Sequence, residues 1–112
     1  MEIERLSTVL PVEDLQEAVS AWSALLGLSP AFVDGDRWAQ FDVAGGRLAL
    51  AGADRLSDAS AVMLKVVDLD RAAAAAERDG LEVGPIEDGP HERRCLVRGM
   101  PGGDVMLYAA RR

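Results

Sequence analysis

A short segment that occurs twice constrains the fold of this chain more than any other feature. Residues 12–15 read VEDL and residues 66–69 read VVDL, so the second copy follows the first by 54 residues (66 − 12). That offset is about half of the 112-residue chain. A repeat on this scale indicates two related supersecondary units, each too small to bury an adequate core alone. The sequence therefore predicts a duplicated fold.

Each copy of the repeat joins a strand pattern to a helix pattern. In the first half, residues 7–12 alternate between two sets of side chains, which is typical of a strand. Asp14 then stands at the N-cap position of a helix, and Gly27 stands where a left-handed residue would end it. Between them, apolar residues recur at intervals of three and four, as in an amphipathic helix: Leu15, Ala18, Val19, Trp22, Leu25 and Leu26.

The second half repeats this order. Residues 61–66 alternate, Asp68 caps a helix built on LDRAAAAAERDG, and Gly80 ends it. Three strand-like segments follow each helix: PAFV, RWAQFDV and GRLALA in the first half, and LEVG, ERRCLVR and DVMLYAA in the second. Each half thus reads as a βαβββ unit. We expect one α+β domain, with a first module over 1–52, a linker over 53–60 and a second module over 61–112.

Composition narrows the class of protein. With 49% hydrophobic and 28% charged residues, the chain is globular rather than disordered. Its net charge of −7 argues against a nucleic acid or an anionic membrane as the partner. The single cysteine, Cys95, excludes an internal disulfide and a cysteine-based zinc site. There is no apolar run of the ~20 residues that a membrane span needs, and the charged N-terminus MEIERLS is unlike a signal peptide. We expect a cytoplasmic protein.

The doubled βαβββ pattern resembles the vicinal oxygen chelate superfamily, the group of glyoxalase I, bleomycin-resistance proteins and extradiol dioxygenases. The segments that carry the resemblance are VLPVEDLQEAVSAWSALLGL, MLKVVDLD and MPGGDVMLY, and together they extend over nearly the whole chain. The resemblance implies two modules whose sheets curl around a cleft. It also implies a homodimer, which in some relatives forms by exchange of modules.

The metal site of this superfamily is the point where the sequence departs from the pattern. The resemblance implies ligands at His or Gln on the first strand of each module and at Glu on the last strand. These positions fall on Ser7, Ala61 and, if residues 106–108 align with the family's I-E-L, on Leu107. None of the three is a plausible ligand for a divalent metal. His91 lies in the turn-rich segment DGPHERR and is interpreted as a solvated side chain. We expect neither a metal nor another cofactor.

Strand alternation divides the side chains into a helix-facing set and a second face. The helix-facing set is almost wholly apolar: Thr8, Leu10, Val12, Ala39, Phe41, Val43, Leu48, Leu50, Val62, Leu64, Val66, Met106 and Tyr108. The second face mixes tryptophan, methionine, small residues and a few cations, as ligand clefts do. The candidate ligand-binding residues on it are Ser7, Trp38, Gln40, Arg47, Met63, Lys65, Cys95 and Leu107. A dimer interface would have the same composition, and the two uses are compatible.

Four of these candidates each have a second interpretation. Trp38 alternates out of phase with Phe41, which favours stacking on a planar ligand, but an interface tryptophan shows the same pattern. Arg47 and Lys65 can meet an anionic ligand or form a solvated rim. Cys95 is placed on the second face by the family spacing, while a lone cysteine is most often an inert buried thiol.

Two functional interpretations remain. The first, which we favour, is a metal-free protein that binds a small, planar or hydrophobic organic molecule, as drug-sequestering relatives do. The alternative is an enzyme of the same superfamily, a lyase, isomerase or oxidoreductase, with a different metal site or none. The missing ligand residues favour the first interpretation. Resistance, biosynthetic and regulatory roles all stay open.

Overall fold

The computed structural model describes residues 1–111 and divides the chain into two compact units. The N-terminal unit is Ser7–Ser60, and the C-terminal unit combines Met1–Leu6 with the chain from Ala61 onward. The first boundary lies inside strand β1 (Ile3–Pro11), which therefore contributes residues to both units.

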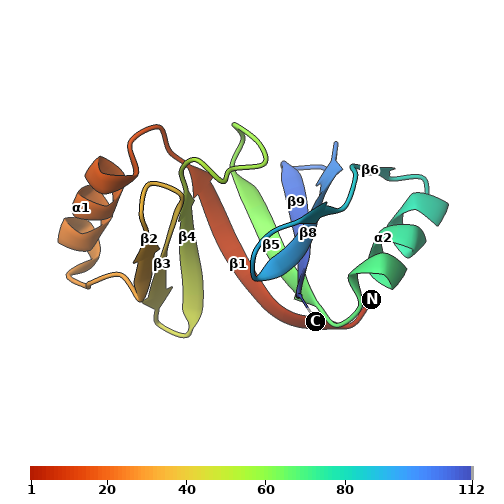
Figure 1. Ribbon diagram of the computed structural model, residues 1–112, viewed down its shortest axis with the longest axis horizontal. Helices are drawn as coiled ribbons and strands as arrows, with labels where there is room; N and C mark the ends of the chain where they lie inside the picture. Colours follow the sequence, from red (N-terminus) through yellow and green to blue (C-terminus); the bar gives the residue numbers. More distant parts are fainter. Residues whose placement is uncertain (112) are drawn as a thin grey trace. The chain divides into compact units, whose positions relative to one another are not determined.

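The N-terminal unit is a four-stranded sheet with one helix (Figure 1). After β1 come helix α1 (Leu15–Leu26) and strands β2 (Phe32–Asp34), β3 (Trp38–Val43) and β4 (Gly46–Ala51). The strand order is β2-β3-β4-β1, with β1 parallel to β4 and the other pairs antiparallel. Helix α1 packs on β3 and β4.

The C-terminal unit repeats this plan. It contains β5 (Ala61–Val66), helix α2 (Leu69–Arg78), β6 (Glu82–Val83), β7 (Glu87–Asp88), β8 (Glu92–Arg98) and β9 (Asp104–Ala110). Strand β9 lies between β5, to which it is parallel, and β8, to which it is antiparallel, while β6 and β7 pair with different parts of β8. The predicted α+β class with two βαβββ modules is confirmed, with β7 as a two-residue addition.

Both helices begin and end as their sequences predict. The side chains of Asp14 and Asp68 accept hydrogen bonds from the backbone N–H groups of Glu17 and Arg71, each at 3.1 Å. Gly27 and Gly80 follow the helices with φ of 67° and 85°, a conformation that glycine adopts without strain. Within residues 1–111, no helix is long and apolar enough to cross a membrane.

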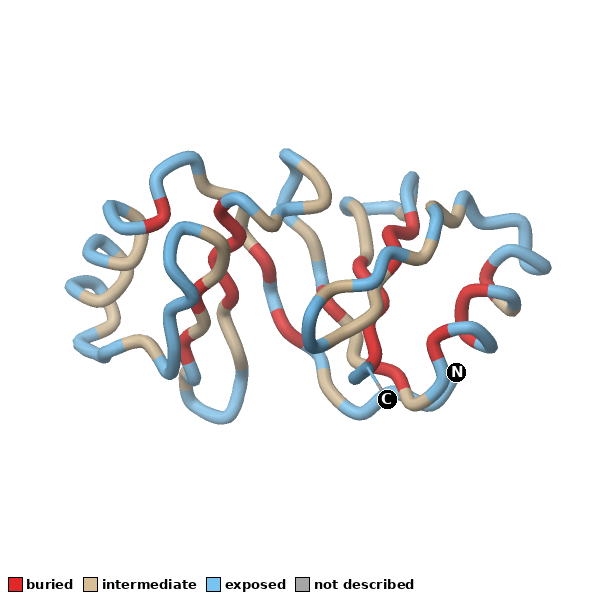
Figure 2. The backbone as a smooth tube through the Cα atoms, viewed as in Figure 1, coloured by how far each residue is buried: buried red, intermediate tan, exposed pale blue. Residues whose placement is uncertain are grey.

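The core of the N-terminal unit confirms the predicted helix-facing set. Phe41, Leu50 and Ala39 are fully buried against Leu15 and the apolar stripe of α1, which includes Trp22. Figure 2 shows the buried stretches of β3 and β4 in red. Leu25, also predicted in that stripe, is 76% exposed. A helix turns about 100° per residue, so Leu25 lies about 80° from Leu15 around the axis, at the margin of the buried face.

The core of the C-terminal unit corrects the predicted faces of β8 and β9. Leu107 is 2% exposed and Cys95 1% exposed, and both pack with Leu64 and Val66 on α2. The register places Leu107 directly opposite Leu64 and Cys95, so these three side chains share the helix-facing side. The prediction that Met106 and Tyr108 face the helix, with Cys95 and Leu107 on the second face, is wrong. The segment DVMLYAA is largely apolar in both phases, so its own alternation does not fix which set faces the helix.

Residues 53–60, predicted as a linker, form part of the N-terminal unit. Gly52 donates a backbone hydrogen bond to the Arg37 carbonyl at 2.9 Å, and Ala53 donates one to the Asp36 carbonyl at 3.0 Å. The Arg37 guanidinium also lies 2.8 Å from Asp54 Oδ2. The segment is therefore held against the turn between β2 and β3.

Candidate functional site

Each sheet has a helix-free face, which we define as the side of its strands that points away from the helix of the same unit. In the N-terminal unit, four of the predicted residues lie on this face: Ser7, Trp38, Gln40 and Arg47. Gln40 is opposite Ala49, which is opposite Val9, and Ser7 shares the face of Val9 because it lies two residues before it.

Trp38 is half-buried at the beginning of β3, between Asp34 of β2 and Ala51 of β4. Because Ala51 and Ala49 carry only methyl groups, the neighbouring strand offers little side chain to cover the indole ring. Further along β3, the Gln40 amide donates to Asp42 Oδ1 at 3.4 Å, and Arg47 Nε lies 3.5 Å from the same oxygen. The indole ring is therefore the largest side chain in this part of the face.

The helix-free face of the C-terminal unit contains two predicted residues, Met63 and Lys65. Four further residues on this face were not among the predicted site residues: Arg94, Leu96, Met106 and Tyr108. The register arranges all six in two rows across β5, β9 and β8. The polar row is Lys65, Tyr108 and Arg94, and the apolar row is Met63, Met106 and Leu96.

No metal centre is evident in the part of the chain that the structure describes: no three His, Cys, Asp or Glu side chains lie close enough to hold an ion. Ser7 and Ala61 occupy the expected ligand positions on the first strand of each module. Since Leu107 lies in the helix-facing core, the last-strand position on the helix-free face is Met106 or Tyr108. A thioether and a phenol are not the imidazole or carboxylate ligands that divalent metals prefer.

Cys95 is not available as a reactive group. Burial raises the pKa of its thiol, which keeps the sulfur protonated and weakly nucleophilic. Cys95 is therefore a packing residue.

Two surface pockets lie around α2 in the C-terminal unit and include none of the predicted site residues. One, of about 530 Å³, is lined by Arg71 and Arg78 together with Glu2 and Asp68, so its formal side-chain charges balance. The other, of about 340 Å³, contains Arg93, whose guanidinium donates to Asp70 at 2.9 and 3.2 Å and to Asp88 at 3.1 Å. In the first pocket both arginines are exposed, and in the second Arg93 is held by carboxylates.

Solved structures with the same arrangement decide the fold. A glyoxalase/bleomycin resistance protein/dioxygenase superfamily member from Vibrio splendidus 12B01 superposes with a TM-score of 0.69 at 15% identity, covering 94% of this chain and 97% of that chain. A variant of Streptomyces coelicolor methylmalonyl-CoA epimerase, in complex with 2-nitronate-propionyl-CoA, gives 0.72 at 17% identity and covers 99% and 100%. The chain has the vicinal oxygen chelate fold.

A structure whose description names a different kind of protein shares this fold. A structure described as NAD-dependent benzaldehyde dehydrogenase from Legionella pneumophila superposes on the vicinal oxygen chelate fold of this chain with a TM-score of 0.83 at 11% identity, covering 95% of this chain and 99% of that chain. No protein-family model and no curated protein matches the sequence. At these identities the likeness is one of fold, and what the site binds depends on its own residues.

Proposed function

We propose that this chain is a metal-free protein that binds a small, planar or hydrophobic organic molecule on the helix-free faces of its sheets. One observation carries the proposal. These faces combine apolar and aromatic side chains with a few polar groups, while the positions of the metal ligands implied by the resemblance hold Ser7 and Ala61. Small-molecule sites are generally built from apolar walls and a small number of orienting polar groups.

Trp38 supplies the aromatic wall in this proposal. It is half-buried, its neighbours in β4 are small, and Gln40 lies two residues further along the same face. A planar ligand stacked on the indole would gain about 0.5–1.5 kcal/mol beyond the effect of area burial. The Gln40 amide provides one polar contact, since its bond to the exposed Asp42 is long at 3.4 Å.

The proposal includes a homodimer, because an interface is the other use of such a face. The N-terminal unit also exposes four large apolar side chains within nine residues, from the end of α1 through the following loop to β2: Leu25, Leu28, Phe32 and Val33. Exposed apolar residues that gather in one region are typical of surfaces that bind another protein.

The test begins with a screen of planar aromatic compounds for quenching of tryptophan fluorescence, followed by titration of each hit against Trp38→Ala. We expect this substitution to weaken binding by about tenfold or somewhat more, because it removes both the stacking contact and buried apolar area. Trp22→Phe is the matched control. Trp22 packs in the helix-facing core, so this variant keeps the emission of Trp38 and should keep the quenching.

The opposite outcome is equally clear. If no compound binds either form, and sedimentation shows that Trp38→Ala converts a dimer to a monomer, Trp38 is an interface residue and the binding proposal fails at this wall. The alternative of an enzyme is checked separately, by elemental analysis of protein purified without chelator. A stoichiometric divalent metal would contradict metal-free binding and favour an enzyme of the superfamily.

A further inference from the structure

Three polar side chains form one row across the helix-free face of the C-terminal unit. Lys65 of β5 is directly opposite Tyr108 of β9, and Tyr108 is directly opposite Arg94 of β8. Neighbouring strands lie about 4.7–4.9 Å apart, so a single small group can contact two or all three of these long side chains. We call Lys65, Tyr108 and Arg94 the donor row.

The polar atoms of the donor row are largely uncommitted. Arg94 forms no hydrogen bond or ion pair with any described residue, although Glu87 of β7 is its partner in the register. The Tyr108 hydroxyl also forms no hydrogen bond, and since the described residues include no buried polar side-chain atom without a partner, water can reach it. Lys65 Nζ forms an ion pair with Glu4 Oε2 at 3.7 Å, a separation longer than a hydrogen bond.

The adjacent residue of β8 shows how unusual this state is. Arg93 points to the opposite side of the sheet and is held by two carboxylates, those of Asp70 and Asp88. Arg94 is half-buried as well but has no such partner. No acceptor among the described residues meets the Arg94 guanidinium, and an anionic ligand would supply one through charge-assisted hydrogen bonds.

The apolar residues beside the donor row would strengthen its hydrogen bonds to an anion. The apolar row of Met63, Met106 and Leu96 lies directly beside the donor row, and all three residues are buried. Because this apolar row lowers the local dielectric constant, charge-assisted hydrogen bonds made by the donor row become stronger. Three carboxylates lie nearby. Glu4 and Glu87 are exposed, and Glu92 is half-buried two residues before Arg94 on the same face of β8; none of them accepts a hydrogen bond from the row among the described residues.

We propose that the donor row binds an oxyanion, a carboxylate or a phosphate, carried by the organic ligand of this protein. The proposal rests on the binding function proposed above and adds the chemical class of the ligand. Arg94 can donate two parallel hydrogen bonds to such a group, Lys65 adds a positive charge, and the Tyr108 hydroxyl adds one more donor.

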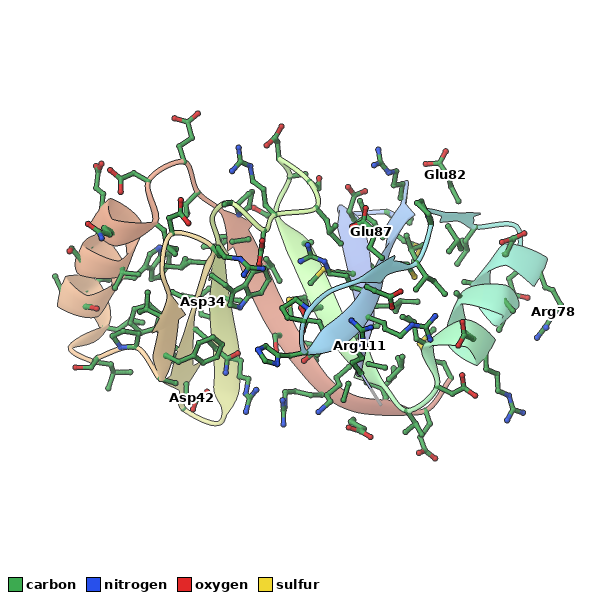
Figure 3. The ribbon with its side chains drawn as sticks, in the orientation of Figure 1. Asp34, Asp42, Arg78, Glu82, Glu87 and Arg111 are labelled. Carbon is green, nitrogen blue, oxygen red and sulfur yellow. The ribbon has the colours of Figure 1, made fainter. Side chains whose placement is uncertain are left out.

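The test compares four probes: naphthalene-2-carboxylate, 2-naphthyl phosphate, the neutral naphthalene-2-carboxamide, and inorganic phosphate. Binding to the wild-type protein, Arg94→Gln and Arg78→Gln is followed by NMR, with the methionine methyl groups and the Tyr108 ring as reporters. Arg78 is the matched control, because it is an exposed arginine on α2 with no ion pair among the described residues (Figure 3). Both substitutions remove one positive charge from the protein.

We expect the two aromatic anions to bind wild-type protein at least about tenfold more tightly than the amide, as charge-assisted hydrogen bonds would give. Arg94→Gln should abolish this preference and leave amide binding unchanged, while Arg78→Gln should alter neither. Tyr108→Phe should weaken the anions by a smaller factor, and Arg94→Lys should restore part of the preference. High salt should weaken the anions selectively.

The two proposals fail in different ways. If the amide binds as tightly as the anions, the oxyanion inference is overturned and the general binding function stands. If Arg94→Gln and Arg78→Gln weaken the anions equally, the effect is one of bulk charge and the inference is again overturned. Inorganic phosphate that binds at the row, without binding of any aromatic probe, supports the oxyanion site and counts against the planar ligand. No response to any of the four probes overturns the inference.

Discussion

The side chain of Leu107 provides the sharpest test of which face of β9 packs against α2. Leu107 is 2% exposed and packs with Val66, Cys95 and Ala73 against α2. Leu107→Ala removes three carbon atoms, each worth about 0.8 kcal/mol of transfer free energy, which gives about 2.4 kcal/mol. Small neighbours such as Ala73 cannot fill the space, so a cavity adds to the cost and the expected total is about 3–4 kcal/mol.

Urea unfolding followed by far-UV circular dichroism measures this loss. The midpoint should fall while the m-value stays unchanged, because the same surface is exposed on unfolding. Leu107→Met is the control, since a swap that conserves volume should cost less than about 1.5 kcal/mol. A cost below about 1 kcal/mol for Leu107→Ala would refute the reasoning, because that is the range of a partly exposed position. Leu107 would then belong to the helix-free face, and the donor row would not exist as described.

Two further predictions concern the loop after β4 and the start of α2. Gly52→Ala should lower the free energy of unfolding by about 1–3 kcal/mol, because the added Cβ would collide with the Asp36 carbonyl and disrupt the hydrogen bonds that hold the loop. An unchanged urea midpoint would contradict the packing of this loop. Arg93 lowers the pKa of Asp70 from its ordinary value of 3.8, chiefly through their hydrogen bonds. The pair therefore stabilises the fold at pH values above 3.8, and this stabilisation is lost as the pH falls through the lower pKa of the folded state. Urea midpoints of wild-type protein and Asp70→Asn should therefore differ at neutral pH and converge in acid, and a constant difference would show that the pair does not titrate in this way.

How far the sequence predicts this molecule depends on whether a feature is local. Helix ends follow from Asp14, Asp68 and the glycines beyond each helix, because a cap involves residues only three or four positions apart. The face of a strand such as β9 is different. Its apolar residues fit either phase, and only the pairing of Leu107 with Leu64 and Cys95, far apart in the sequence, selects one.

The candidate site shows the same limit. Trp38, Gln40 and Arg47 lie on the predicted face because β3 alternates clearly and its partner β4 follows after a short turn. The donor row joins β5, β8 and β9, and no local pattern in ERRCLVR or DVMLYAA indicates that Arg94 and Tyr108 are neighbours. To predict the donor row from the sequence, one would need to know how β5, β9 and β8 are paired.

Strand β1 has a consequence for any attempt to divide this protein. Its first residues run beside β5 in the C-terminal unit, where the Val67 N–H donates to the Glu2 carbonyl at 3.1 Å, while its later residues pair with β4. A polypeptide that starts at residue 61 would leave the backbone of β5 open along one side, and open strand edges recruit strands from other molecules. Division of the chain at residue 60 would therefore deprive the C-terminal unit of a strand that only the N-terminal segment supplies.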